Sequence, residues 1–316
     1  MDGLAAADLK SIVAPLHFLM PMAERPVAYN YEPPPGTPQR TGSSEEHQVV
    51  IRDARPLIGR LSLDKEGFVL LRHQTAVKNF YDQDEIASVY YPECERVIKE
   101  ATGAARVVAF DHIVRNAAVS AKGNAIKIPA KRVHDDYTAW SAPQRVRDLM
   151  GEEAEELLQH RFAIINLWRP IRGPVLESPL ALCDALSLSE ENLVASDLKY
   201  PDRTGETYSV TYNPDQRYYY FPKMQPDEPV LIRCFDSAPE GAARFSAHTG
   251  FDDPTSPPGA PPRESLEVRT LVFFRRAPDS AGRLTGSTFP GRFHPLLPRA
   301  RGRGAAGCIM QLSLKV

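Results

Sequence analysis

The chain has 316 residues, of which 42% are hydrophobic and 25% charged, and this fits a soluble globular protein with a substantial core in one large domain or two small ones. Its formal net charge of -2 gives no reason to expect nucleic acid or an anionic membrane as a partner. No stretch approaches the roughly 18 apolar residues that span a bilayer, and the 4 cysteines form no C-x-x-C pair, so we expect reduced thiols in a cytoplasmic protein.

The N-terminal half mixes extended segments with helices. We expect residues 1–45 to form an extended segment, because Pro33–Pro38 is a stiff connector. Residues 82–102 have the apolar spacing of a helix, with Pro92 suited to a first turn and Gly103 to a C-terminal cap. A second, mostly polar helix is predicted over 142–159. Short strands are expected at 48–52, 67–71 and 107–110.

The C-terminal half is dense in short apolar runs. Strands are predicted at 162–169, 207–212, 216–221, 229–235, 244–248 and 265–274. Runs of this density between loops rich in proline and glycine indicate a sandwich, jelly roll or barrel. We therefore predict one mainly β (α+β) domain over 46–276, in which N-terminal helices buttress a β core.

The tail, 277–316, has scattered arginines, glycines and prolines and no apolar period, so it is expected to be a loosely ordered extension. A basic docking role stays open. Within it, Cys308–Leu312 is the apolar piece that could return to the sheet or bury in a homodimer contact.

A His-x-Asp unit, His134 and Asp136, follows an alternating apolar run at 125–133. If that run is a strand, residues i and i+2 project from one face, so the imidazole and carboxylate can hold two adjacent positions of a metal. A third ligand would complete the facial triad of non-haem Fe(II) oxygenases. The alternative is a strand-end turn with a capping aspartate.

The third ligand is expected to be His248, at the end of a predicted strand, with His112 as runner-up. The next strand carries Arg263, Ser265 and Arg269 at one parity, so they share a face. A buried arginine near a metal needs an anion, and the far carboxylate of 2-oxoglutarate would supply it. Alternatively, these arginines are surface charges on an edge strand.

Six segments, taken in order over roughly residues 50–275, resemble one family of Fe(II)/2-oxoglutarate oxygenases. This family includes the cephamycin 7α-hydroxylase component, gibberellin desaturase and enzymes that form meroterpenoid endoperoxides. The matching segments are Tyr90–Glu93, Thr102–Ala104, Phe110–His112, Val133–Asp136, Asn166–Pro170 and Pro262–Arg269.

The resemblance implies a double-stranded β-helix (jelly-roll, cupin-like) core with His134, Asp136 and His248 on Fe(II), and with 2-oxoglutarate and O2 as cosubstrates. It also implies that an arginine of the last core strand binds 2-oxoglutarate. Two arginines fit: Arg263 with Ser265 forms an Arg-x-Ser pair, whereas Arg269 lies deeper in the strand and is favoured. Arg169 is a third possibility.

The expected activity is oxidation of an unactivated C–H in a small molecule, in secondary metabolism, by hydroxylation, desaturation, cyclisation or peroxidation. Candidate substrate contacts are Tyr90, Tyr91, Tyr137, Trp140 and Arg169, although core packing is the more frequent fate of such aromatic residues. The alternative is a zinc-dependent hydrolase or a ligand-binding β-barrel without activity. The arginines of the last strand discriminate, because a zinc hydrolase needs no 2-oxoglutarate clamp.

Overall fold

The computed structural model describes residues 9–116, 118, 126–127, 129–238 and 243–275. The chain divides into two compact units, Met1–Arg276 and Ala277–Val316, and the first of them carries the fold described below. The predicted tail at 277–316, with Cys308–Leu312, lies outside the described residues.

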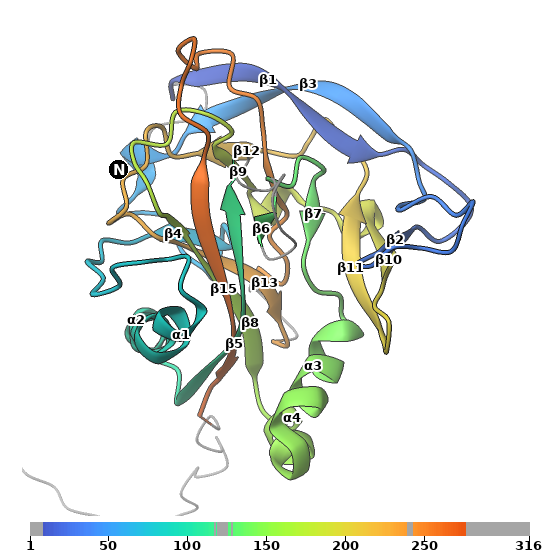
Figure 1. Cartoon of the computed structure of the whole chain (residues 1–316), viewed down its shortest axis with the longest axis vertical. Helices are drawn as coiled ribbons and strands as arrows, with labels where there is room; N and C mark the ends of the chain where they lie inside the picture. Colours follow the sequence, from blue (N-terminus) through green and yellow to red (C-terminus); the bar gives the residue numbers. More distant parts are fainter. Residues whose placement is uncertain (1–8, 117, 119–125, 128, 239–242, 276–316) are drawn as a thin grey trace, which may run out of the picture. The chain divides into compact units, whose positions relative to one another are not determined.

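Two sheets make up the described unit (Figure 1). The order in the nine-stranded sheet is β1 (Ser11–Leu19), β3 (Ser44–Asp53), β12 (Tyr218–Tyr220), β9 (Leu180–Cys183), β14 (His248–Gly250), β7 (His134–Asp135), β11 (Thr204–Val210), β10 (Leu193–Lys199) and β2 (Val27–Tyr29). The order in the six-stranded sheet is β4 (Phe68–Leu70), β13 (Val230–Asp236), β8 (Phe162–Pro170), β15 (Glu264–Phe273), β5 (Arg106–Asn116) and β6 (Ile126–Lys127).

Strand β8 is buried on both faces. Its side chains alternate between the two faces of the sheet, so neighbouring residues pack into two different cores. Phe162, Ile164 and Trp168 pack in the core that also takes side chains of β9 and β12 from the other sheet. Ala163 and Ile165 pack instead with the helical layer. The continuous apolar run is therefore explained by burial on both sides of the sheet.

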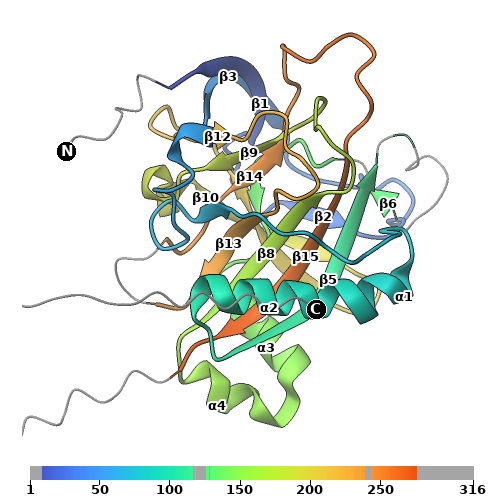
Figure 2. The same cartoon turned by 90° about the vertical axis from the view of Figure 1, so that its left-hand side faces the viewer.

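The helices occupy two segments. The first begins at α1 (Gln83–Glu85), passes through a π-helical turn (Ile86–Tyr90) and continues as α2 (Tyr91–Thr102). The Asp82 side chain caps its start and Gly103 its end, so the predicted helix at 82–102 is confirmed. Figure 2 shows α2 lying across the six-stranded sheet, where Val97 and Ile98 join its outer apolar face.

The second helical segment contains α3 (Ser141–Met150) and α4 (Ala154–Leu158), separated by a 3-10 turn at Gly151–Glu153. The sequence predicted one helix here. Further 3-10 turns lie at Arg55–Leu57, Ala185–Ser187 and Glu190–Asn192.

The run at 125–133 is only partly a strand in its described residues. Its described residues form β6 (Ile126–Lys127) and then a segment with a single β-bridge, which joins Arg132 to His17 of β1. Pro129 has no N–H for a ladder, while the Val133 N–H donates to the carbonyl of His17 at 2.9 Å. The segment is thereby held extended up to β7.

Candidate metal centre

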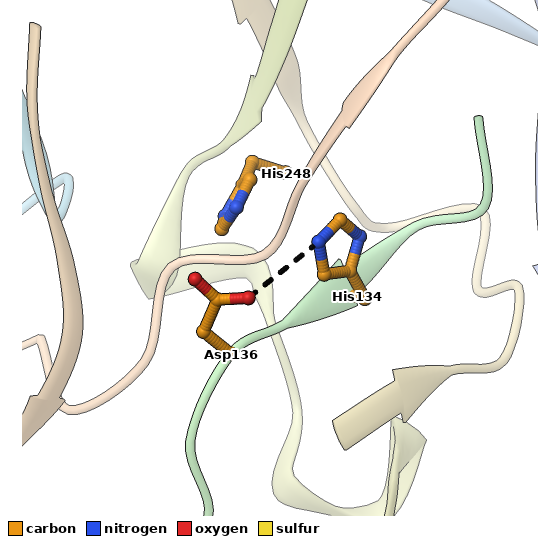
Figure 3. Close-up of side chains that lie close together, drawn as sticks. All are labelled: His134, Asp136 and His248. Carbon is orange, nitrogen blue, oxygen red and sulfur yellow. Dashed lines mark ion pairs between the residues drawn. The ribbon is translucent and has the colours of Figure 1, made fainter. Parts of the chain in front are cut away.

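Three side chains predicted as ligands converge between β7 and β14. His134 and His248 are directly opposed across the antiparallel β7–β14 pair, so their side chains share a face. Asp136 follows β7 by one residue, and its Oδ1 lies 3.8 Å from His134 Nε2. One ligand atom from each residue lies within 4.8 Å of the others (Figure 3). The group is compact enough to surround one metal ion.

Backbone carbonyls orient both imidazoles. His134 Nδ1 lies 2.8 Å from the carbonyl of Arg132, and His248 Nδ1 lies 3.1 Å from that of Ser246. A carbonyl only accepts, so each Nδ1 carries the proton and each Nε2 keeps a free lone pair. Burial, and then the neighbouring His248, lower the pKa of His134 to about 3. The ring is therefore neutral and ready to bind a cation.

The Asp136 carboxylate is fixed by donors from the other sheet. Its Oδ2 accepts from Asn166 Nδ2 at 2.7 Å and from Arg269 Nε at 3.0 Å. Burial acts to raise the pKa of Asp136, but the Arg269 guanidinium, followed by the two neighbouring histidine rings, holds it below its usual range. Oδ1 remains for a metal, and this two-His, one-carboxylate donor set suits non-haem Fe(II).

Asp135 connects the two strands that carry the histidines. It is fully buried and its Oδ2 accepts from the backbone N–H of Ser246 at 2.9 Å. The carbonyl of Ser246 in turn receives His248 Nδ1–H. Asp135 therefore positions the His248 side of the centre, a role that the sequence interpretation missed.

Arg269, the favoured carboxylate clamp, is surrounded by acidic side chains. It donates to Asp136, to Asp111 at 2.9 Å and to Glu267 at 3.2 Å. Its charge is already balanced within the protein, and its contact with Asp136 places it beside the metal centre.

Arg263, the other candidate, is buried without a carboxylate contact among the described residues. Its Nη1 donates to the carbonyl of Ser178 at 2.6 Å, and its guanidinium lies 5.5 Å from the ring centroid of Trp168. Burial lowers the pKa of Arg263 to about 9. Within the described part of the chain, Arg263 Nε and the Oγ of buried Ser265 find no hydrogen-bond partner. Near the start of β15, two buried polar groups are thus available to bind a ligand.

A cavity of about 730 Å³ opens onto the metal centre and is lined by His134, Asp136 and Arg269. Strand β2 contributes Tyr29 to its wall, and β10 and β11 form another side. The cavity is large enough for a drug-sized molecule.

The predicted substrate contacts divide into two groups. Tyr137 and Trp140 line a smaller recess of about 80 Å³ beside Asp136 and Arg269. Tyr137 is buried, whereas Trp140 is 56% exposed. Both are therefore close to the centre.

The other predicted contacts pack elsewhere. Arg169 donates from Nε to the Tyr90 hydroxyl at 2.6 Å, and both residues are buried. The Tyr91 hydroxyl lies 2.7 Å from Nδ1 of His112, whose Nε2 lies 2.7 Å from Gln83. His112 is therefore occupied by this pair, and it does not join the three converging ligands.

Comparisons with known proteins agree with this chemistry. A family model described as "Oxidoreductase/YMDC permease-like domain" matches residues 16–273. The chain is 35% identical over 249 residues to hydroxylase/desaturase efuI of Hormonema carpetanum, covering 72% of this chain and 83% of that protein. It is 33% identical over 252 residues to Fe(II)/2-oxoglutarate-dependent dioxygenase nvfI of Aspergillus novofumigatus, covering 78% and 90%.

The fold has a solved counterpart. A structure of the iron and alpha-ketoglutarate-dependent endoperoxidase NvfI matches with a TM-score of 0.77 and 30% identity, over 84% of this chain and 99% of that one. The predicted mainly β jelly-roll class is confirmed by this likeness. Among the described residues, no helix is long and apolar enough to cross a membrane.

Proposed function

This chain belongs to the family of Fe(II)/2-oxoglutarate-dependent dioxygenases, and from this premise we propose that its catalytic metal is held by His134, Asp136 and His248. It is an enzyme that uses Fe(II), 2-oxoglutarate and O2 on a small molecule of secondary metabolism. The zinc-hydrolase and non-enzymatic alternatives are not supported, because the relatives carry oxygenase names.

The metal assignment is supported above all by the orientation of the donors. Both imidazoles turn an unprotonated Nε2 inward, and Asp136 keeps one oxygen free. When bound, iron with 2-oxoglutarate and O2 supplies the oxidising power that removes hydrogen from an unactivated C–H. The protein's part is to hold the ligands, keep Asp136 ionised and orient the substrate in the cavity.

We assign the far carboxylate of 2-oxoglutarate to Arg263 and Ser265. A buried guanidinium with an unpartnered Nε favours an anion, and the Ser265 hydroxyl can donate to the same group. Gly250 lies against Arg263, and it shares a strand face with His248 roughly 7 Å away. A five-carbon dicarboxylate has a length comparable to this span. Arg269 is then a positioning residue for Asp136.

Two arginine variants test this assignment. Replacing Arg263 with Ala removes a charge-assisted pair worth about 2–5 kcal/mol, so the dissociation constant of 2-oxoglutarate should rise roughly 30-fold or more. Arg263→Lys keeps the charge without the planar fork and should recover only part of the affinity. The measurement is an anaerobic titration of the Fe(II)-loaded protein with 2-oxoglutarate, followed by the weak visible charge-transfer band.

The parallel variant is Arg269→Ala, for which iron affinity should fall more than 2-oxoglutarate affinity. The assignment is wrong if Arg269→Ala weakens 2-oxoglutarate binding while Arg263→Ala leaves it unchanged. If both variants keep the wild-type affinity for 2-oxoglutarate, neither arginine is the clamp.

The proposed oxidation is a hydroxylation, a desaturation or an endoperoxide formation, because the relatives are named hydroxylase/desaturase and endoperoxidase. Tyr137 and Trp140 are the proposed aromatic substrate contacts, because they line the recess beside Asp136.

A cytoplasmic location is supported by the buried, unpaired thiols of Cys94, Cys183 and Cys234. Cell fractionation tests the location, and sedimentation tests the homodimer.

A further inference from the structure

The cavity at the metal centre is lined by more basic than acidic side chains. Among the described residues, six basic side chains line it, but Asp136 is its one carboxylate, and that group is assigned to the metal. The basic residues are Arg40, Arg115, Lys127, Lys131, Arg132 and Arg269. Whether an anionic ligand is favoured here depends on which of these cations are already paired.

Some of these cations are already paired with carboxylates. Arg269 is held by Asp136 and two further carboxylates. Lys131 Nζ pairs with Asp252 at 2.6 Å. Neither residue needs a ligand to balance its charge.

Arg132 differs because its identified partners are neutral. Its Nε donates to the Ser44 hydroxyl at 2.7 Å and its Nη2 to the carbonyl of Gly42 at 2.9 Å. These bonds fix the guanidinium on the turn before β3. At Gly42 that turn needs glycine, since φ is +81° and a Cβ would lie 2.9 Å from Leu19 Cδ1.

Arg40 adds a second cation to the same wall. It precedes Gly42 by two residues, is exposed and lines the cavity. Within the described ranges, neither Arg40 nor Arg132 forms an ion pair with a carboxylate. Two neighbouring cations in a cavity, one of them half-buried, are stabilised by an anion.

Arg132 also lies close in the chain to two of the proposed metal ligands. Arg132 and His134 lie two residues apart in an extended segment, so their side chains share a face, and Asp136, at the bend after β7, lines the same cavity. Two residues at this spacing in an extended chain are roughly 7 Å apart. A group bound at Arg132 therefore lies one side-chain step from the metal ligands.

The rest of the wall combines apolar residues with five neutral polar ones, Asn30, Thr41, Ser196, Thr207 and Ser209. Val27, Ala28, Ile113, Pro129 and Leu198 contribute to its apolar part, and Tyr29 and Tyr200 add aromatic surface. Such a lining suits a hydrophobic molecule with few charges.

We propose that the substrate is an amphipathic organic acid, with an apolar body and a carboxylate or phosphate group that Arg132, together with Arg40, binds. This inference deepens the proposed function, on which it rests for the reaction. The anion site is separate from the one assigned to 2-oxoglutarate at Arg263.

Matched probes can test the anion site without the true substrate. The full chain, loaded with Mn(II) and 2-oxoglutarate so that the cosubstrate site is filled, is titrated calorimetrically with 1-naphthylacetate, 1-naphthylacetamide and 1-naphthyl phosphate. The acid should bind at least tenfold more tightly than the amide, and comparison with the phosphate identifies the preferred anion.

Variants connect that preference to named residues. Arg132→Gln should reduce the acid-to-amide ratio to about one, Arg40→Gln should reduce it in part, and Arg132→Lys should restore part of it. The matched control is Lys131→Gln, which removes a cation of the same wall already paired with Asp252 and should leave the ratio within twofold. Unfolding temperatures identify any variant that has lost its fold.

Equal affinity of the wild-type chain for acid and amide would overturn the inference, as would an unchanged ratio in folded Arg132→Gln. A loss of 2-oxoglutarate binding in Arg132→Gln would assign Arg132 to the cosubstrate and also overturn it. If the wild-type protein binds no 2-oxoglutarate, the proposed function fails, whereas the acid-to-amide ratio with Mn(II) alone still tests the anion site.

Discussion

Asn166 determines how the Asp136 carboxylate faces the metal centre. Its Nδ2 donates to Asp136 Oδ2, while its own Oδ1 is buried without a partner among the described residues. It comes from β8, on the sheet opposite the histidines. A neutral amide therefore fixes one carboxylate oxygen and leaves the other free for metal.

We predict that Asn166→Ala lowers Fe(II) affinity roughly tenfold, because a donor that holds a metal ligand in place typically contributes that much or more. The measurement is an anaerobic metal-binding titration. Thr270→Val is the control, since it removes a buried hydrogen bond to the carbonyl of Ile165 without touching the ligands. Equal metal affinities in wild type and Asn166→Ala would show that Arg269 alone suffices to orient Asp136.

Part of the candidate site could be predicted from the sequence, residue by residue. The spacing of His134 and Asp136 predicted two side chains that do converge. His248 was chosen because it was expected to end a strand at 244–248, whereas in the structure it begins β14. Asn166 carried a signal that was not used: a polar residue inside the apolar run at 162–167. The difference between Arg263 and Arg269 could not be predicted, because it depends on which carboxylates surround each guanidinium in the folded chain.

At the scale of elements, β14 carries both His248 and the residue that contacts the proposed clamp. A Cβ built on Gly250 would lie 3.2 Å from Arg263 Nη1 and 3.1 Å from the carbonyl of Ala130. Both contacts are tighter than ordinary packing. A side chain at Gly250 would therefore make the Arg263 guanidinium or the Ala130 carbonyl shift by a few tenths of an ångström.

Gly250→Ala should raise the dissociation constant of 2-oxoglutarate roughly tenfold, since a small displacement of a positioning group is costly. Iron affinity should change little, because the close neighbours of Gly250 include no metal ligand. Gly205→Ala in β11 is the matched strand control, with its nearest neighbour at an ordinary 3.6 Å. Parallel binding titrations of both variants decide, and indistinguishable 2-oxoglutarate affinities would contradict the prediction.

Strand β1 shows why some elements were missed. Ala14, Leu16 and Phe18 alternate into the core, the period expected of a half-buried strand. Pro15 lowers the strand signal, but β1 is the edge of its sheet, where a missing N–H is tolerated. By contrast, β8 and β15 were predicted because no proline interrupts the apolar residues at 162–169 and 265–274. The fold class was accessible from such runs, whereas the pairing order depends on long-range contacts.

At the scale of the whole described unit, the metal centre joins the two sheets. The histidines belong to β7 and β14 of the nine-stranded sheet, while Asp136 is held by Asn166 of β8 and Arg269 of β15 in the six-stranded sheet. Opening either sheet would separate the ligands from their supports. Metal binding is therefore coupled to the folding of the unit as a whole rather than to one loop.

We predict that Mn(II), a redox-silent substitute for Fe(II), raises the unfolding temperature of the full chain by several degrees. At a metal concentration roughly 100 times the dissociation constant the native state gains about 2.7 kcal/mol, provided the unfolded chain does not bind. His134→Ala should lose this shift. His112→Ala is the control, because its imidazole pairs with Tyr91 instead, so the shift relative to its own metal-free form should persist. If His112→Ala loses the shift and His134→Ala keeps it, the third ligand and the centre itself have been misassigned.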